Sequence, residues 1–217
     1  RKGLALAATE LKADPSSVTF ERGRYRARGK SASIGIAELA GKHAGASPHP
    51  LDAQGEIELK RTFPGGAHVA EVEVDPDTGV IRVESYVAVD DCGRVLNHVL
   101  LEGQLHGGIV QGLGQVLGEH CIYDRASGQL LTGTFMDYVM PRVSVLRAAR
   151  LYDHSIPSPH NPLGAKGGGE AGTTGAVPAV ANAVLDALSP LGIDRLDLPY
   201  TPARVWQAIS AARRRKP

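Results

Sequence analysis

The chain has 217 residues, 42% of them hydrophobic and 22% charged, so it can bury a substantial core and disorder is excluded as its main state. Lys and Arg number 24 against 23 Asp and Glu, and the net charge of +1 gives no overall electrostatic reason to expect nucleic acid or an anionic membrane as a partner. No apolar run approaches the roughly 20 residues that span a bilayer, so we expect no membrane span. Two cysteines without a C-x-x-C pair favour a reducing, cytoplasmic location.

Residues 1–54 predict a small helix and hairpin segment that ends in a loop. The chain opens at Arg1 inside a helical pattern, so we expect it to be a piece of a longer protein whose activity is lost in isolation. The expected elements are a helix from Leu4 to Leu11, strands over 18–20 and 25–27, a helix over 33–40 capped by Ser33, and a surface loop over 41–54.

Residues 55–217 predict a second domain, in which the apolar period changes to two. The turn 75–79, Asp-Pro-Asp-Thr-Gly, lies between two alternating runs and indicates a hairpin. Hairpins mixed with helices favour an α+β fold of mixed sheets and packed helices over a parallel doubly wound one. The expected elements are strand residues Ile57 and Leu59, strands over 69–74 and 80–89, a helix over 97–120 capped by Asn97, a hairpin over 122–131, a strand over 149–154, and helices over 178–188 and from Thr201.

The helix expected over 97–120 contains six glycines, although each glycine costs about 1 kcal/mol in a helix interior relative to alanine. We therefore expect another backbone or a bulky cofactor to approach this helix closely. Gln104, on the same helix, offers two donors and one acceptor to an amide-bearing or pterin-like ring, although a solvent-facing glutamine explains it equally well.

The segment 164–175 is rich in glycine and leads into a helix N-terminus, where an anionic group is favoured. It is not a P-loop, because Lys166 precedes the glycines instead of following them. A flexible linker is one interpretation of this loop. Glu170 favours a second interpretation, a catalytic loop, because a carboxylate among small neighbours is accessible to a substrate and can act as a general base.

Other catalytic arrangements are poorly supported by the sequence. His43, His49 and His68 lack the spacing of metal ligands, and we expect no metal bound directly by protein side chains. A serine hydrolase is equally unsupported, since no G-x-S-x-G motif occurs.

Several separated motifs resemble the molybdopterin-binding large subunits of the xanthine oxidase family, which includes aldehyde oxidoreductases and aerobic carbon monoxide dehydrogenase. The resemblance covers most of the chain in order, and it departs from the family pattern at His98, where proline is usual. The matching segments are 89–97 (VDDCGRVLN), 102–109 (EGQLHGGI), 111–115 (QGLGQ), 134–138 (TFMDY), 141–142 (PR), 159–172 (PHNPLGAKGGGEAG) and 178–184 (PAVANAV).

The resemblance implies that the chain is the C-terminal portion of such a large subunit and carries one wall of the active site. Glu170 matches the family's glutamate beside the metal, a general base. Gln104, with Gly103 beside it, is expected to bond the pterin, and the loop Lys166, Gly167, Gly168 and Gly169 is expected to pack against it.

The resemblance also implies the cofactors and partners. They are molybdenum-molybdopterin in its cytosine dinucleotide form, the N-terminal part of the same subunit, and partner subunits that carry [2Fe-2S] centres and FAD. The implied reaction is oxidative hydroxylation of an aldehyde, an N-heterocycle or carbon monoxide. Two alternatives stay open: a nucleotide- or phosphate-binding module built on the loop 164–175, and a noncatalytic assembly domain.

Overall fold

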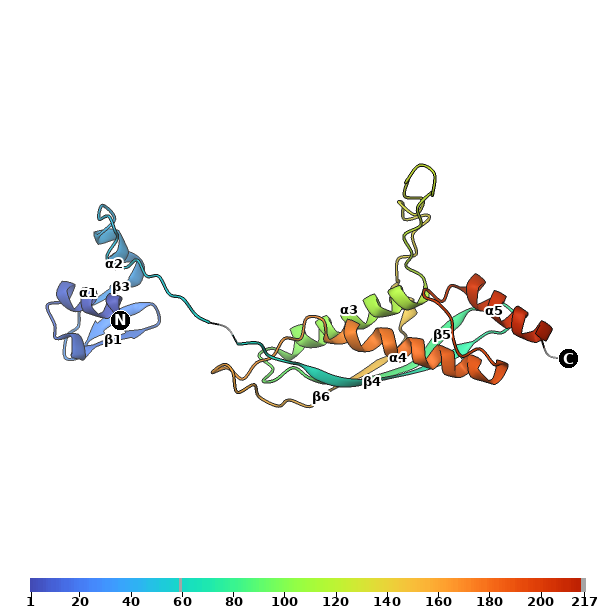
Figure 1. Cartoon of the computed structure of the whole chain (residues 1–217). Helices are drawn as coiled ribbons and strands as arrows, with labels where there is room; N and C mark the ends of the chain where they lie inside the picture. Colours follow the sequence, from blue (N-terminus) through green and yellow to red (C-terminus); the bar gives the residue numbers. More distant parts are fainter. Residues whose placement is uncertain (59, 216–217) are drawn as a thin grey trace. The chain divides into compact units, whose positions relative to one another are not determined.

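The computed structural model describes residues 1–58 and 60–215, and its helices and antiparallel strands give the expected α+β class (Figure 1). The chain consists of two compact units, unit 1 over Arg1–Leu59 and unit 2 over Lys60–Pro217. The candidate site belongs entirely to unit 2.

Unit 1 is a three-stranded antiparallel sheet with two helices. Its strands pair in the order β1-β2-β3, and its core consists of small and branched side chains with one tyrosine, Tyr25. The elements are α1 (Lys2–Glu10), a 3-10 turn at Pro15–Ser17, β1 (Val18–Glu21), β2 (Arg24–Ala27), β3 (Ser33–Gly35) and α2 (Ile36–Lys42).

The start of α2 corrects one prediction, because Ser33 is not its cap. Residues 33–35 form β3, which pairs with β2 and buries Ile34, and the helix begins only at Ile36 after Gly35. The Ser33 hydroxyl instead accepts a hydrogen bond from Nε of Arg24 at 3.1 Å. A three-residue strand is too short to show a period of two, which explains the error.

Unit 2 is built on a mixed sheet in the order β4-β5-β6. The strands are β4 (Gly65–Val74), β5 (Ile81–Asp91) and β6 (Ala149–Asp153). The predicted hairpin is confirmed: β4 and β5 are antiparallel, and Gly79 takes the positive φ of +73° that this turn requires. β6 pairs with β5 in parallel, with Tyr86 opposite Ala149. Residues 55–58 belong to no helix or strand, and Leu59 lies outside the described residues.

Three helices complete unit 2. They are α3 (His98–Leu117), α4 (Ala171–Leu188) and α5 (Pro202–Arg215), together with 3-10 turns at Val143–Val145 and Ser189–Leu191. Asn97 caps α3 as predicted, with its side-chain oxygen accepting from the Leu100 N–H at 3.1 Å. α4 packs against α3 on one side and against β4 on the other (Figure 1). The fully buried side chains in the core of this unit include Tyr86, Ile109, Leu113, Val116, Val180, Val184, Val205 and Ile209.

The glycines of α3 confirm the expected close approach of another backbone at two positions. A Cβ added to Gly108 would lie 3.0 Å from the Thr173 nitrogen, and one added to Gly112 would lie 2.7 Å from the Ala176 Cβ, both on α4. A Cβ added to Gly103 or Gly107 would instead have open space around it. Two of the glycines therefore serve helix packing, and two others face away from any close neighbour.

α4 begins seven residues before the predicted start at Pro178. The proline lies inside the helix, where it lacks an N–H to donate to the preceding turn, but the helix continues through it. The Thr174 N–H already bonds the Glu170 carbonyl at 2.9 Å. The glycine-rich loop is therefore shorter than predicted, and Glu170 is the N-cap residue of α4.

The hairpin predicted over 122–131 forms only one isolated bridge, between Tyr123 and Leu130. β6 follows it as predicted over 149–154, ending one residue earlier at Asp153. Within residues 1–58 and 60–215, no helix is long and apolar enough to cross a membrane.

Candidate functional site

The glycine-rich loop is fixed to the end of β5 by backbone hydrogen bonds. The Arg94 N–H donates to the Gly164 carbonyl and the Lys166 N–H donates to the Cys92 carbonyl, both at 2.9 Å. Gly93 and Ala165 form an antiparallel bridge at the same place. These bonds join segments about 70 residues apart in the chain, so the loop has a defined path and is not a flexible linker.

Lys166 forms an ion pair with Asp91 that reinforces this attachment. Its Nζ lies 2.5 Å from Asp91 Oδ2, and the two side chains are only 13% and 16% exposed. Asp91 Oδ1 also accepts from the N–H groups of Gly93, at 2.9 Å, and Ile156, at 3.0 Å. The hydrogen bond from Lys166, followed by the one from Ile156, lowers the pKa of the Asp91 carboxyl to about 2. The ammonium group of Lys166 is therefore already engaged within the protein.

The lowered pKa of Asp91 predicts a stability difference that depends on pH. Because the fold favours the charged carboxylate, its contribution to the free energy of unfolding is complete above pH about 4 and is lost as the pH falls through about 2. Urea unfolding of the wild-type chain and Asp91→Asn should therefore differ above pH about 4 and converge near pH about 2. Lys166→Ala should move this transition toward pH about 4. An equal difference between wild type and Asp91→Asn at both ends of this range would contradict the assignment.

Gln104 lies across from the last glycine of the loop. Its Nε2 donates to the Gly169 carbonyl at 2.7 Å, which leaves the side-chain carbonyl and the second amide hydrogen available to a ligand. Gly168 packs tightly, because a Cβ there would lie 2.7 Å from Leu101 Cδ1 and 3.2 Å from Cys92 Sγ. Gly167 and Gly169, like Gly103 on α3, have open space where a side chain would stand.

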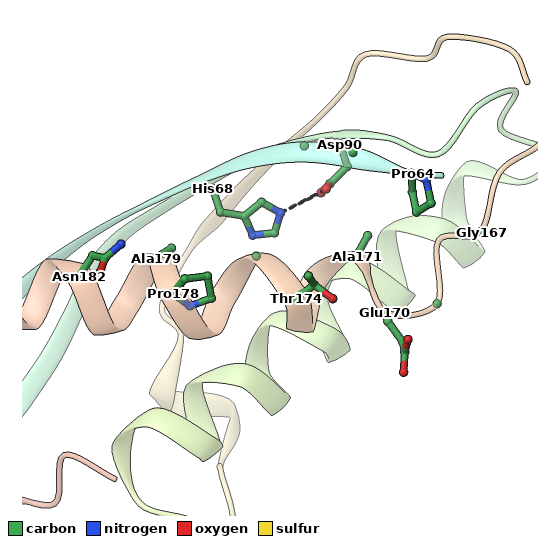
Figure 2. Close-up of a pocket in the computed structure, with 14 residues that line it drawn as sticks. Pro64, His68, Asp90, Gly167, Glu170, Ala171, Thr174, Pro178, Ala179 and Asn182 are labelled. Carbon is green, nitrogen blue, oxygen red and sulfur yellow. Dashed lines mark hydrogen bonds and ion pairs between the residues drawn. The ribbon is translucent and has the colours of Figure 1, made fainter. Parts of the chain in front are cut away.

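A cavity of about 700 Å³ lies between the loop, the start of β4 and the first turns of α4. Figure 2 shows Glu170 at its rim, where its carboxylate points away from His68 and Asp90. Glu170 is exposed in this chain. The lining residues are Pro64, Gly65, Gly66, His68, Asp90, Gly167, Gly169, Glu170, Ala171, Thr174, Gly175, Pro178, Ala179 and Asn182.

Two residues that line the cavity, His68 and Asp90, form a buried polar group with Tyr86. His68 Nδ1 lies 2.7 Å from the Tyr86 hydroxyl, and His68 Nε2 lies 3.2 Å from both oxygens of Asp90. The His68 and Asp90 side chains are 3% and 5% exposed. Burial raises the pKa of Tyr86, and the nearby charge of Asp90 raises it further, so the hydroxyl keeps its hydrogen. The tyrosine can then donate to Nδ1 while Nε2–H donates to the carboxylate.

No sequence motif indicates this group, but the alternation of buried and exposed residues in β4 and β5 does. His68 occupies the same face of β4 as Ala70, Val72 and Val74, and it is partly buried like them. Asp90 continues the buried series of Tyr86 and Ala88 on β5. A histidine and an aspartate at core-facing positions of paired strands need polar partners, which predicts that they meet.

The structure brings most of the predicted site residues together at one end of unit 2. The loop Lys166–Glu170 and Gln104 are neighbours, joined by the hydrogen bond from Gln104 to the Gly169 carbonyl. In the part of the chain that the structure describes, no group of three His, Cys, Asp or Glu side chains could hold a metal ion.

Comparison with known proteins identifies the family of this chain. The family of the molybdopterin cofactor-binding domain matches residues 1–146. The carbon monoxide dehydrogenase large chain of Hydrogenophaga pseudoflava is 33% identical over 96% of this chain. The nicotine 6-hydroxylase large subunit of Paenarthrobacter nicotinovorans is 36% identical, also over 96%. The chain spans only 26% of each of these two relatives.

Two solved structures are also similar to this chain over nearly its whole length. A copper- and molybdenum-containing carbon monoxide dehydrogenase superposes with a TM-score of 0.70 at 30% identity, over 97% of this chain and 27% of that one. Quinoline 2-oxidoreductase from Pseudomonas putida 86 gives a TM-score of 0.67 at 36% identity, over 96% of this chain and 28% of that one. The chain belongs to the molybdopterin cofactor-binding domain family, and it is homologous to the C-terminal part of the large subunits of molybdenum hydroxylases.

Proposed function

We propose that this chain supplies one wall of the active site of a molybdenum hydroxylase, with Glu170 as its general base. The observation that supports this most directly is the position of Glu170: it is the N-cap residue of α4 and one of the residues that line the cavity, directly after an anchored loop of three glycines. Unit 2, which corresponds to most of the predicted domain 55–217, contains every residue of this proposed site.

The residues around the cavity fit a molybdopterin cofactor. Gly167 and Gly169 line the cavity without side chains, so a flat ring can approach the backbone there. Gln104 is held by Gly169 and retains an amide oxygen and hydrogen that match the mixed donor and acceptor edge of a pterin. Gly103 leaves open space beside it. Lys166 contributes through its backbone and through the ion pair that fixes the loop.

In the reaction, this chain orients the cofactor and accepts a proton. When bound, the molybdenum cofactor supplies the two-electron oxidation. Hydroxylation of a substrate by water releases protons, and Glu170 is an accessible carboxylate that can accept one of them. The anchored loop, whose Gly169 carbonyl accepts from Gln104, would hold the cofactor edge on one side of the cavity, and Glu170 follows this loop directly in the chain.

The proposed form of the cofactor, the electron acceptors and the substrate class are based on the family and on the relatives. We assign the cofactor to the cytosine dinucleotide form and the electron acceptors, [2Fe-2S] centres and FAD, to partner subunits. The substrate is an aldehyde, an N-heterocycle or carbon monoxide, since the relatives named above include a nicotine hydroxylase, a quinoline oxidoreductase and carbon monoxide dehydrogenases. The unpaired Cys92 and Cys121 are consistent with a reducing cytoplasmic location.

This proposal is tested by comparing the isolated chain with a complete large subunit that contains it. Cofactor affinity in such a site is distributed over all of its walls, and this chain corresponds to 26% of the length of its relatives. Residues 1–217 alone should therefore contain no molybdenum and oxidise no aldehyde, purine or carbon monoxide. The complete subunit, produced with its partners, should contain molybdenum and be reduced by substrate. Stoichiometric molybdenum in the isolated chain, or none in the complete subunit, would contradict the proposal.

Gln104→Ala in the complete subunit should lower its molybdenum content. The substitution removes the bond to the Gly169 carbonyl and leaves polar groups of a buried cofactor unpaired, at a cost of about 1–3 kcal/mol in cofactor affinity. Metal analysis of the purified protein measures the effect. Gln129→Ala is the matched control, because Gln129 is an exposed glutamine outside the motif segments that resemble the family. Equal molybdenum content in the two variants would exclude a role for Gln104.

A further inference from the structure

His68, Tyr86 and Asp90 are buried polar side chains that the proposed reaction does not use, although His68 and Asp90 line its cavity and Tyr86 hydrogen-bonds His68. We propose that His68 is a positioning residue for Glu170: its imidazole sets the depth at which the first turns of α4 pack against β4. This inference rests on the proposed function of Glu170 and explains how that carboxylate is held in place.

The first step is that the His68 ring has a fixed orientation. Tyr86 holds Nδ1 at 2.7 Å and Asp90 holds Nε2 at 3.2 Å, so both ring nitrogens are occupied by groups from the neighbouring strand. The Tyr86 ring also meets the imidazole edge to face, at a centroid distance of 5.7 Å and an angle of 88°. A ring held at both nitrogens and against an aromatic neighbour is a rigid spacer.

The second step is that α4 rests directly on this ring. A Cβ added to Gly175 would overlap His68 Nδ1, so only glycine allows the helix backbone to reach the imidazole face. Figure 2 shows the imidazole between β4 and α4, close to the helix N-terminus. Glu170 precedes Gly175 by five residues, about 7.5 Å along the helix axis. A shift of the helix at Gly175 therefore moves Glu170 with it.

The third step is that the first turns of α4 are also in close contact with α3. A Cβ added to Gly172 would lie 2.5 Å from the Leu105 carbonyl oxygen and 2.9 Å from the Ile109 nitrogen on α3. The N-terminal turns of α4 thus rest on both α3 and the His68 ring. Removal of the ring takes away the support on one side, and the helix can move toward β4.

The test uses the complete enzyme with its cofactor and measures the rate of reduction by substrate in a single turnover, with molybdenum content determined in parallel. His68→Ala should lower the limiting rate by about 10–10²-fold at unchanged half-saturating substrate concentration, because misplacement of a catalytic group by about 1 Å has effects of this size. Val69→Ala, on the exposed face of the same strand, should leave the rate unchanged. If His68→Ala loses its molybdenum, Tyr86→Phe replaces it in the test, because it keeps the aromatic core and removes only the hydroxyl that holds Nδ1.

Two double variants separate positioning from a general structural role. His68→Ala should cause no further loss of rate in a Glu170→Gln background, since it acts through Glu170. Gly175→Ala should restore part of the rate in His68→Ala by filling the space that the ring leaves, although it lowers the rate in the wild type.

A normal rate in both His68→Ala and Tyr86→Phe, or a loss that multiplies with that of Glu170→Gln, would overturn the positioning role while the proposed function stands. A normal rate in Glu170→Gln itself would instead remove the proposed function and this inference with it.

Discussion

Glu170→Gln in the complete, cofactor-loaded enzyme is expected to lower the rate of reduction by substrate by about 10²–10⁴-fold, the usual contribution of a positioned general base. Glutamine keeps the volume of the side chain and removes its proton affinity. The residue is exposed at the N-cap of α4 and its side chain makes no capping hydrogen bond, so the fold should barely change. Rapid-mixing measurement of enzyme reduction, with molybdenum content determined on the same samples, gives the effect on the chemical step.

The matched control for Glu170→Gln is Glu84→Gln. Glu84 is an exposed carboxylate on the outer face of β5, away from the core-facing series of that strand, and its substitution should leave the rate within about twofold. If Glu170→Gln retains full molybdenum and a near-normal rate, Glu170 is not the base. A large loss in both variants would point to a general effect of charge on the enzyme.

Gly172→Ala is expected to destabilise unit 2 by about 1–3 kcal/mol, the usual cost of inserting a methyl group into a closely packed contact. The added Cβ would lie 2.5 Å from the Leu105 carbonyl oxygen and 2.9 Å from the Ile109 nitrogen. Both atoms belong to the backbone of α3, so neither can rotate away as a flexible side chain would. Urea unfolding of the chain followed by circular dichroism measures the change in the free energy of unfolding.

Gly107→Ala is the control for the same substitution in open space. Gly107 lies in α3 with nothing near the position of an added Cβ, and alanine lowers the entropy of the unfolded chain. This variant should be stabilised by about 0.4–1 kcal/mol. Opposite signs for the two variants would show that α3 and α4 are in close contact in solution, whereas equal effects would contradict that contact.

The sequence predicts the elements of unit 2 best where a long run of residues follows one apolar period. The β4 and β5 hairpin and its Asp-Pro-Asp-Thr-Gly turn are local patterns, and the cap of α3 at Asn97 needs only its own side chain. The start of α4 is not readable in the same way, because Pro178 is typical of a first turn but lies inside this helix. The parallel pairing of β6 depends on a contact across about 60 residues, which no local pattern contains.

In the candidate site, the sequence predicts the residues that belong to motifs but not the contacts between residues far apart in the chain. Motif resemblance leads to Gln104, the glycine loop and Glu170 without any knowledge of geometry. It does not show that Lys166 is engaged by Asp91, because this ion pair joins residues 75 positions apart. His68 was set aside as a histidine without metal-ligand spacing, and its partners are found only when the register places it diagonally between Tyr86 and Asp90 on the paired strand.

The parallel pairing of β6 with β5 also has a consequence for how this unit is assembled. β5 is the central strand, and its second edge stays unpaired until residues 149–153 return to it. The bonds that anchor the glycine loop, from Lys166 to Asp91 and to the Cys92 carbonyl, span a similar distance in sequence. Contacts of such high contact order form slowly, since a long loop must close before they contribute. The β4 and β5 hairpin should therefore form first, and the wall that meets the cofactor should become ordered only in the last stage of folding.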